Sequence, residues 1–217
     1  MKLSDQLWKL YHRLWEVFGP QGWWPGESPF EIAVGAILTQ NANWTNVTRV
    51  IAQLQQAGRL SPFGLHELSE LELAQFLRPV GYYNLKARRL KNFLDFLLAH
   101  YQGAVENMAR DDLEHLRPAL LSINGIGPET ADSILLYALE KPTFVVDAYT
   151  FRILHRHDLV TDPCSYEELR QVFMAHLPAE VALFKEYHAL LVRLGKEFCR
   201  PRPRCDQCPL SGLDFSD

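Results

Sequence analysis

The sequence predicts an all-α fold, and three observations carry that prediction. Apolar residues recur at helical spacing along most of the 217 residues. No stretch alternates between polar and apolar residues for long enough to predict a β-sheet. A hydrophobic fraction of 47% supports a substantial core, and the length allows one sizeable domain or two small ones.

The first predicted helix covers residues 3–18, with leucines at helical intervals on one side and Gly19-Pro20 at its end. A loop of turn-forming residues follows and carries Trp23 and Trp24. Two adjacent tryptophans in such a loop either cover the core or offer a surface on which another ring can stack.

Further helices are expected over residues 29–40, 43–57, 66–77, 82–101, 111–121, 128–139, 148–156, 165–177 and 180–196. The turn between the first two places polar Gln40 and Asn41 shortly before Trp44. The fourth segment is amphipathic, and we expect its basic residues, among them Lys86 and Arg88, on the face opposite its leucines. Such a basic run is either a solvated helix face or a DNA contact.

The most informative local pattern is the hairpin Gly125-Ile126-Gly127. Its glycines permit a tight turn and close approach of another surface. The first N–H groups of the following helix, which includes Glu129 and Thr130, have no partner inside the helix. Together with the positive end of the helix dipole, they form a backbone site suited to a phosphate.

Asp147 follows the apolar run Phe144-Val145-Val146, twenty residues after Gly127. Aspartate is a favoured N-cap for the helix that starts at the next residue. Its carboxylate can also stabilise a positive charge that develops during a reaction, and can orient or deprotonate a water. One side chain can serve both roles.

The net charge of −4 argues against an extended basic surface, so DNA binding would depend on local patches. One patch includes Lys86 and Arg88, and another contains Arg200, Arg202 and Arg204. The chain has no sequence that resembles a signal peptide and no apolar run near the ~20 residues of a membrane helix. We therefore expect a soluble, intracellular protein that does not contact a membrane.

Five segments together resemble one family: WWPG at 23–26, AILTQNANW at 36–44, GYYNLKARRL at 81–90, GIGPETADSILLYA at 125–138 and VVDAYT at 145–150. With Arg152, they resemble the endonuclease III superfamily of helix-hairpin-helix (HhH-GPD) DNA glycosylases. Within it, the likeness is greatest to the endonuclease III-like 3-methyladenine DNA glycosylases. The resemblance covers residues 23–155 well and the C-terminal helices loosely.

The resemblance implies an architecture of two helical domains. An inserted helical barrel domain with the helix-hairpin-helix would span residues 26–137. The second domain would combine residues 1–25 with residues 138–217 and its C-terminal cysteine loop. In this family the active-site cleft lies between the two domains.

The resemblance also implies a reaction. Asp147 matches the family's catalytic carboxylate, whereas bifunctional members carry, at the position of Glu129, a lysine that forms a Schiff base with C1′. A carboxylate cannot form that imine. The expected protein is thus a monofunctional glycosylase that leaves an abasic site, unless Lys141 or Lys196 substitutes. The alternatives are an endonuclease III-type glycosylase and AP lyase for oxidised pyrimidines, and a non-catalytic DNA-binding module.

The expected substrate is a flipped alkylated purine of the 3-methyladenine type in duplex DNA. A cationic base is attracted to an indole face, and the resemblance places Trp44 under the base. The other residues of the expected pocket are Trp23, Trp24 and Pro25. Gln40 or Asn41 would fill the gap that the flipped base leaves, unless either is only a polar helix cap.

The expected DNA contacts are the hairpin, Glu129, Thr130, Lys86 and Arg88. Family members often bind a monovalent cation through carbonyl groups of the hairpin, so we expect one here. The partner is double-stranded DNA with a damaged base. The protein is expected to be monomeric and cytoplasmic, and associated with the nucleoid in a bacterium.

The C-terminal segment carries Cys199, Cys205 and Cys208 with C-x5-C-x2-C spacing, which suggests a metal or cluster loop. The resembled family binds a 4Fe–4S cluster through C-x6-C-x2-C-x5-C. The first gap is one residue short here, and the fourth position holds Asp214. Asp214, Cys164 or a small molecule would complete a cluster; zinc and a loop without metal are the alternatives.

Overall fold

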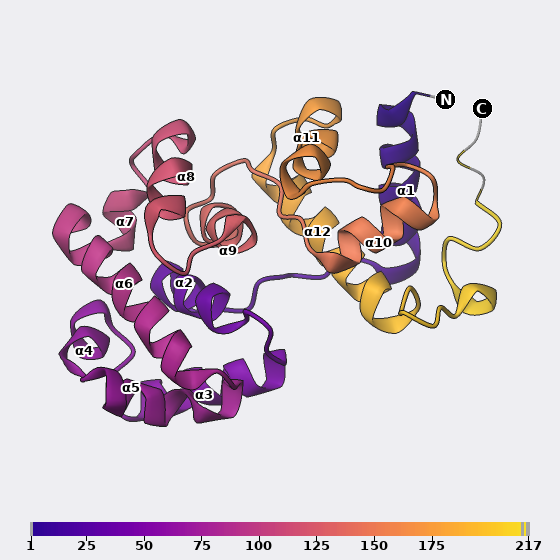
Figure 1. Cartoon of the computed structure of the whole chain (residues 1–217). Helices are drawn as coiled ribbons and strands as arrows, with labels where there is room; N and C mark the ends of the chain where they lie inside the picture. The colour runs from indigo at the N-terminus through magenta and orange to yellow at the C-terminus, as the bar shows by residue number, and fades with distance from the viewer. Residues whose placement is uncertain (1, 214, 216–217) are drawn as a thin grey trace. The chain divides into compact units, whose positions relative to one another are not determined.

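The computed structural model of the chain describes residues 2–213 and 215, and these residues form twelve α-helices and no strand (Figure 1). Short 3₁₀ turns and one π-helical turn complete the regular structure. The predicted all-α class is confirmed. Among the described residues, no helix is both long and apolar enough to span a bilayer.

The chain divides into two compact units. The central unit comprises Pro25–Lys141, and the terminal unit comprises Met1–Trp24 together with Pro142–Asp217. The chain therefore leaves the terminal unit after its first helix and returns to it after the helix that follows the hairpin.

The central unit is built around α2 (Pro29–Leu38), which is apolar on almost every side. A helix of this composition must be enclosed by others. It contacts α3 (Trp44–Gln56), α6 (Tyr83–Tyr101), α9 (Pro128–Ser133) and the π-helical turn Ile134–Ala138 that continues α9. Ser28 caps α2 by accepting a hydrogen bond from the Glu31 N–H.

The remaining helices of the central unit differ from the expected pattern. The predicted helix over 66–77 is two helices, α4 (Pro62–Glu67) and α5 (Glu70–Leu77), because Leu68 is extended and Ser69 starts α5 with a capping box. The short α7 (Val105–Met108) was not predicted. It lies between α6 and α8 (Leu113–Ser122), and α4 and α5 pack on α6 (Figure 1).

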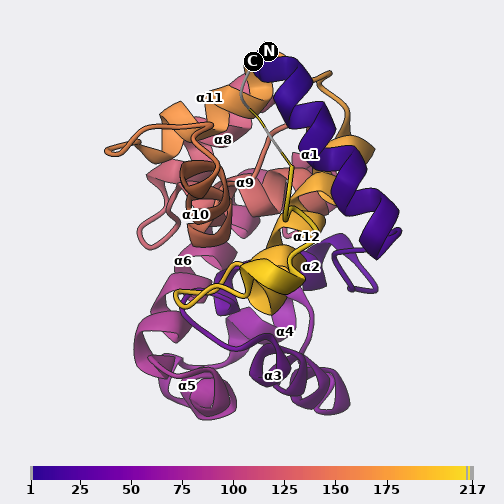
Figure 2. The same ribbon diagram turned by 90° about the vertical axis from the view of Figure 1, so that its right-hand side faces the viewer.

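The terminal unit contains α1 (Leu3–Phe18), α10 (Ala148–Arg156), α11 (Tyr166–His176) and α12 (Val181–Glu197). Both α1 and α10 pack on α12 (Figure 2). The core between the helices is aromatic: the ring of Phe144 stacks on Phe173 at 3.7 Å, and Phe184 and Tyr187 meet Phe144 edge to face.

A buried ion pair joins the two helices that flank the hairpin. Arg117 of α8 donates from Nε and Nη2 to the carboxylate of Asp132 in α9, at 2.9 and 3.1 Å. The Asp132 side chain is fully buried, and that of Arg117 is 18% exposed. The pair thus fixes the two helices to each other where water screens little of the charge.

We predict that Asp132→Asn lowers the free energy of unfolding by about 3–5 kcal/mol, because it leaves the Arg117 charge without its buried counter-ion. The matched control is Glu67→Gln, which breaks the Arg59–Glu67 pair of 3.0 Å between side chains that are 41% and 68% exposed. That change should cost less than about 1 kcal/mol. Urea unfolding measures both, and equal losses would contradict the prediction.

Candidate functional site

The hairpin between α8 and α9 requires glycine at one position and merely allows it at another. Gly125 has φ +97°, and a Cβ there would collide with the side chain of Arg89. Gly127 has φ −89°, and a Cβ there would have no atom of the described chain within 4 Å. Nothing within the described protein therefore demands a glycine at 127.

Backbone bonds shape the turn. The N–H of Ile126 donates to the carbonyl of Ile123 at 3.0 Å, and Ile126 packs inward with 4% of its surface exposed. Gly127 is the N-cap of α9, which starts at Pro128, and as a glycine it has no side chain to cap the first turn of that helix. Gly127 and Glu129 are exposed, so the first-turn N–H groups belong to a part of the surface open to an anion.

Side chains of the neighbouring helices support the hairpin from inside the central unit. Gln40 Nε2 donates to the Gly125 carbonyl at 3.0 Å and to Thr130 Oγ1 at 2.9 Å. Arg89 Nη1 donates to Gln40 Oε1 at 2.5 Å. Asn92 Nδ2 donates to the carbonyl of residue 124 at 2.9 Å. The Gln40 amide is thus engaged at both its oxygen and its nitrogen.

This network distinguishes Gln40 from Asn41, which were the two candidates for the residue that fills the gap left by a flipped base. Gln40 is held inside the unit, whereas Asn41 is exposed and has φ 51°, a conformation that asparagine tolerates better than most residues. Neither is the cap of the next helix: Asn43 caps α3, and its Oδ1 accepts from the Thr45 N–H at 2.9 Å.

Lys86 was expected on a basic surface, and the structure shows that this was wrong. Its side chain is 1% exposed, and its Nζ donates to the carbonyls of Leu38 and Val80 at 2.8 and 2.9 Å. The inner face of α6 contains Lys86 and Ala87, so Leu85 falls on the outside with 45% exposure. Residue 86 ties the end of α2 to α6 and is unavailable to DNA.

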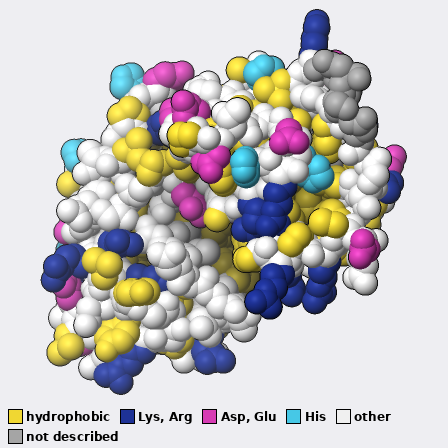
Figure 3. Space-filling view, turned by 45° about the vertical axis from the view of Figure 1, so that its right-hand side comes forward, with side chains coloured by type: hydrophobic (Ala, Val, Ile, Leu, Met, Phe, Trp, Pro, Cys, Tyr) yellow, Lys and Arg dark blue, Asp and Glu magenta, His cyan; other side chains and the backbone are white. Residues whose placement is uncertain are grey.

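Arg88 lies on the surface as expected. Its side chain is 67% exposed and its Nε is 3.7 Å from Glu70, a loose pair that leaves it open to solvent. On the face drawn in Figure 3, lysine and arginine side chains form several groups separated by acidic and hydrophobic ones. On this face the basic surface is therefore local, in keeping with the net charge of −4.

Asp147 caps α10, and its two carboxylate oxygens have different surroundings. Oδ1 accepts from the Thr150 N–H at 2.7 Å and from Thr150 Oγ1 at 2.9 Å. Oδ2 lies 3.7 Å from Nε2 of His188 in α12, which is ion-pair distance but too long for a hydrogen bond. The Asp147 side chain is 12% exposed.

These neighbours determine the charge of Asp147. Burial raises the pKa of the carboxyl group, but His188 and the two Thr150 donors stabilise the anion and lower it further than burial raises it. The net pKa lies below the ordinary aspartate value, so Asp147 is ionised at neutral pH. An ionised, nearly buried carboxylate can stabilise an adjacent positive charge strongly.

The position of Asp147 depends on how α10 packs on α12. Gly195 of α12 lies against Tyr149, and a Cβ there would collide with the tyrosine side chain. Arg152 Nε donates to the Cys199 carbonyl at 2.6 Å, just beyond the end of α12, and its guanidinium lies 5.2 Å from the Tyr149 ring. Tyr149 and Arg152 thus hold α10 against α12 and the residue just beyond its end. These contacts fix where Asp147, at the start of α10, lies relative to α12.

The expected pocket residues are divided between the units. Trp23 and Trp24, in the terminal unit, have ring centroids 5.5 Å apart in an edge-to-face arrangement, and Lys196 Nζ lies 5.4 Å from the Trp23 centroid. Trp44 begins α3 of the central unit and is half-buried, and Pro25 is exposed.

The cysteine loop is fastened by arginine. Arg156 of α10 donates to the carbonyls of Arg200 and Pro201 at 2.6 and 3.1 Å, and its Nη1 is 3.5 Å from Cys199 Sγ. Cys199 is buried, Cys208 is half-buried and Cys205 is exposed. The Arg156 guanidinium thus attaches the first residues of the cysteine loop to α10.

The described residues do not supply a complete ligand set for a cluster. No three His, Cys, Asp or Glu side chains within residues 2–213 and 215 are arranged to hold a metal ion. Asp214, one expected fourth ligand, lies outside the described residues. Cys164, the other, has Glu168 and Asp162 as its electrostatic neighbours, whereas those of Cys208 are Cys199 and Cys205. A cluster at this loop stays a prediction.

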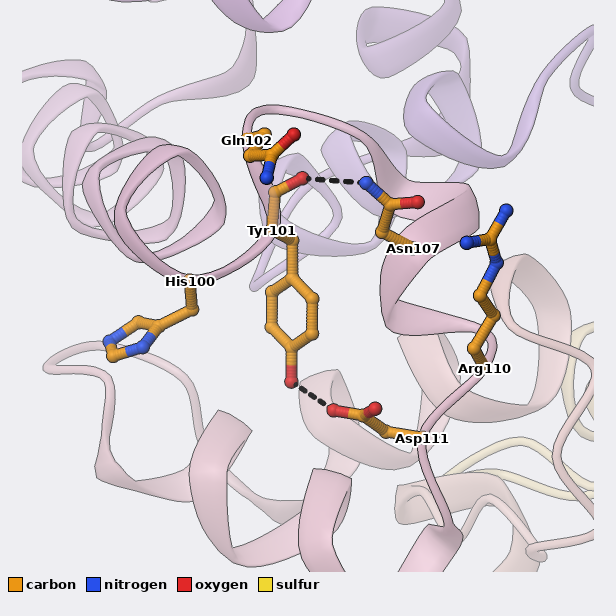
Figure 4. A pocket seen from close by; sticks show the side chains of 6 residues that line it. All are labelled: His100, Tyr101, Gln102, Asn107, Arg110 and Asp111. Atoms are coloured by element: carbon orange, nitrogen blue, oxygen red, sulfur yellow. Dashed lines mark hydrogen bonds between the residues drawn. The ribbon is translucent and has the colours of Figure 1, made fainter.

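A polar pocket lies where α6 ends and α7 follows (Figure 4). The Tyr101 hydroxyl donates to Asp111 Oδ2 at 2.7 Å, and Asn107 Nδ2 donates to the Tyr101 carbonyl at 3.2 Å. Burial, and then the contact with Asp111, raise the pKa of Tyr101 to about 12. None of the residues expected in the active site lines this pocket.

The helical fold, the hairpin and the capping aspartate define a class of DNA repair protein. The chain belongs to the HhH-GPD superfamily of base excision DNA repair proteins, whose family model matches residues 34–179. The resemblance to this superfamily is thereby confirmed, and the protein is a member of a DNA glycosylase family.

Individual relatives agree with this assignment. A Methanocaldococcus jannaschii protein, provisionally named a DNA repair glycosylase, is 46% identical over 98% of this chain and 97% of its own length. Endonuclease III of Escherichia coli is 28% identical over 86% of this chain and 83% of that protein. The structure of H. pylori 3-methyladenine DNA glycosylase bound to 1,N6-ethenoadenine has 27% identity and a TM-score of 0.76, covering 91% of this chain and 98% of that one.

Three side chains that support the hairpin or Asp147 were not predicted from the sequence: Arg89, Thr150 and His188. Arg89 was visible only as one member of a basic run, and nothing in its local pattern indicated that it supports the hairpin. Thr150 follows Asp147 at the spacing of an N-cap partner, which is a usable signal. His188 is far from Asp147 in sequence, and only the packing of α12 on α10 brings them together.

The buried Lys86 predicts a pH dependence of stability. Burial, and then the charge of Arg89, lower its pKa to about 8 in the folded protein, against about 10.4 in an unfolded chain. Between these values the unfolded state holds a proton that the folded state lacks, so stability rises with pH across that window and is flat below it. The total gain is at most roughly 3 kcal/mol.

The matched variant is Lys86→Met, which keeps an unbranched side chain of similar length and removes the titrating amine. Urea unfolding should show the wild type gaining stability relative to the variant between about pH 8 and 10.4. A difference between the two proteins that does not change with pH would show that Lys86 titrates normally.

Proposed function

We propose that the protein is a monofunctional DNA glycosylase that hydrolyses the N-glycosidic bond of alkylated purines in duplex DNA. The observation that carries the proposal is Asp147: an ionised carboxylate, nearly buried, with one oxygen fixed by Thr150. Its position at the start of α10 follows the family hairpin at the spacing noted in the sequence.

The proposed reaction needs one carboxylate. As the bond between C1′ and the base nitrogen breaks, positive charge spreads over C1′ and the ring oxygen of the sugar, and the Asp147 carboxylate stabilises it. Water then adds to C1′ and releases a proton, for which Asp147 is the acceptor. An alkylated purine carries a positive charge before cleavage, so it leaves with little help from an acid.

The proposed DNA contact is the hairpin. Gly127 is exposed, has ordinary backbone angles and meets nothing within the described protein that would exclude a side chain. A close approach by a phosphate to the first-turn N–H groups of α9 supplies the missing reason for a glycine there. Asn41, exposed in the neighbouring turn, is our choice for the residue that fills the gap left by the flipped base.

Two observations support alkylated purines as the substrate class. Trp44 and the Trp23–Trp24 pair supply indole faces, which attract a cationic base. The solved structure that shares 27% identity over 91% of the chain is that of a 3-methyladenine DNA glycosylase.

The alternative of a lyase has its own support. Endonuclease III of E. coli is a relative. Glu129 cannot form an imine, but Lys196, beside Trp23, has a primary amine on the surface of the terminal unit. Borohydride trapping of protein on damaged DNA separates the two reactions, because only an imine is reduced to a stable adduct.

We predict that Asp147→Asn abolishes base release while DNA affinity stays close to that of the wild type, since the neutral amide cannot stabilise the cationic sugar. The assay incubates protein with methylated duplex DNA, follows free base by chromatography, and scores strand nicks before and after mild alkali. Free 3-methyladenine with nicks only after alkali supports a monofunctional enzyme.

The other outcomes of this assay discriminate between the candidates. Nicks without alkali would establish a lyase and contradict the proposed reaction. An Asp147→Asn protein that releases base at the wild-type rate would remove Asp147 from the mechanism. If the wild type releases no alkylated base, oxidised pyrimidines are the substrate to test.

The hairpin yields a paired prediction. Gly127→Ala should fold with an unchanged unfolding midpoint, because its Cβ meets open space, but should bind duplex DNA at least tenfold more weakly. Gly125→Ala should lower the midpoint, because φ +97° and the contact with Arg89 both oppose a Cβ. Fluorescence anisotropy and thermal unfolding measure the two effects. Full DNA affinity in Gly127→Ala would exclude a phosphate at this turn.

A further inference from the structure

His188 is a nearly buried histidine of α12 for which the proposed reaction has so far no use. Its side chain is 6% exposed, and its Nε2 lies 3.7 Å from Asp147 Oδ2. The other oxygen of the carboxylate already accepts both hydrogen bonds from Thr150. Oδ1 is therefore hydrogen-bonded within the first turn of α10, whereas Oδ2 has a histidine of α12 at ion-pair distance.

We propose that His188 is a positioning residue that keeps Asp147 ionised and holds Oδ2 in place for the reaction. The proposal rests on the function proposed above, because it assigns His188 a part in the work of Asp147. It concerns contacts within the terminal unit alone, so it depends on no other part of the chain.

The physical argument starts from the cost of a buried charge. A carboxylate that is 12% exposed loses most of its hydration, which favours the neutral acid. The groups that oppose this are His188 from α12 and Thr150 from α10. Thr150 offers two neutral donors, whereas His188 can offer a donor and, when protonated, a full positive charge.

Loss of His188 should slow the chemical step and not the binding of DNA. A protonated Asp147 can neither stabilise a cationic sugar nor accept a proton from water, so loss of His188 should affect the chemical step. It should leave the binding of DNA unchanged, since the hairpin that we assign to phosphate lies in the central unit.

The test compares His188→Leu, which removes both donor and charge, with His188→Gln, which keeps an N–H donor without the charge. The readouts are the pH dependence of single-turnover base release, DNA affinity, and the ¹³C NMR titration of the Asp147 carboxyl group, assigned by its absence in Asp147→Asn. His157→Gln is the matched control, because His157 is a half-buried histidine of the same unit whose ring meets Phe215.

We expect the acidic limb of the rate profile of His188→Leu to move up by at least about one pH unit, a tenfold loss of rate on that limb. His188→Gln should lie between it and the wild type, and His157→Gln should match the wild type. The Asp147 carboxyl should titrate at higher pH in the leucine variant, and DNA affinity should stay within twofold.

Unchanged titration of Asp147 in His188→Leu, with an unchanged rate profile, would overturn the proposal. So would an equal loss of rate at every pH accompanied by loss of DNA affinity, which would mark a purely structural residue. The NMR titration needs no substrate, so it tests the Asp147–His188 coupling even if the wild type releases no alkylated base. That last result would refute the proposed function and leave the coupling to be judged separately.

Discussion

The packing of α10 on α12 is the constraint on which the candidate site depends. Gly195 has no side chain, and the Tyr149 ring occupies the space where one would lie. This close approach allows Asp147 at the start of α10 to come within 3.7 Å of His188. It also lets Arg152 reach the Cys199 carbonyl beyond the end of α12. One small residue thus permits three contacts along a single helix.

The hairpin of the central unit also depends on a glycine whose missing side chain makes room for a neighbour. The missing side chain of Gly125 leaves room for Arg89, which holds Gln40, and Gln40 in turn holds the Gly125 carbonyl and Thr130. These hydrogen bonds hold the turn on its inner side. On its outer side Gly127 is exposed, and a Cβ added there would meet no atom of the described chain within 4 Å, which leaves room for an external anion.

Parts of this protein were accessible from sequence because they rest on local rules. Helical periodicity predicted the all-α class. The N-cap role of Asp147 followed from its residue type and place before a helix. The single predicted helix over 66–77 was wrong, although Ser69 and Glu72 carry the capping-box signature that divides it. The error arose because apolar periodicity was given more weight than a start signal inside it.

The sequence by itself determined the fold class, the superfamily and the positions of the hairpin and Asp147, because these are encoded by residue type and spacing along one segment. Tertiary structure alone decided that Lys86 points inward to the carbonyls of Leu38 and Val80, and that His188 faces Asp147. The physical reason is that a helix presents several faces to its surroundings. Which face becomes buried, and beside which distant residue, is settled only when the helices pack.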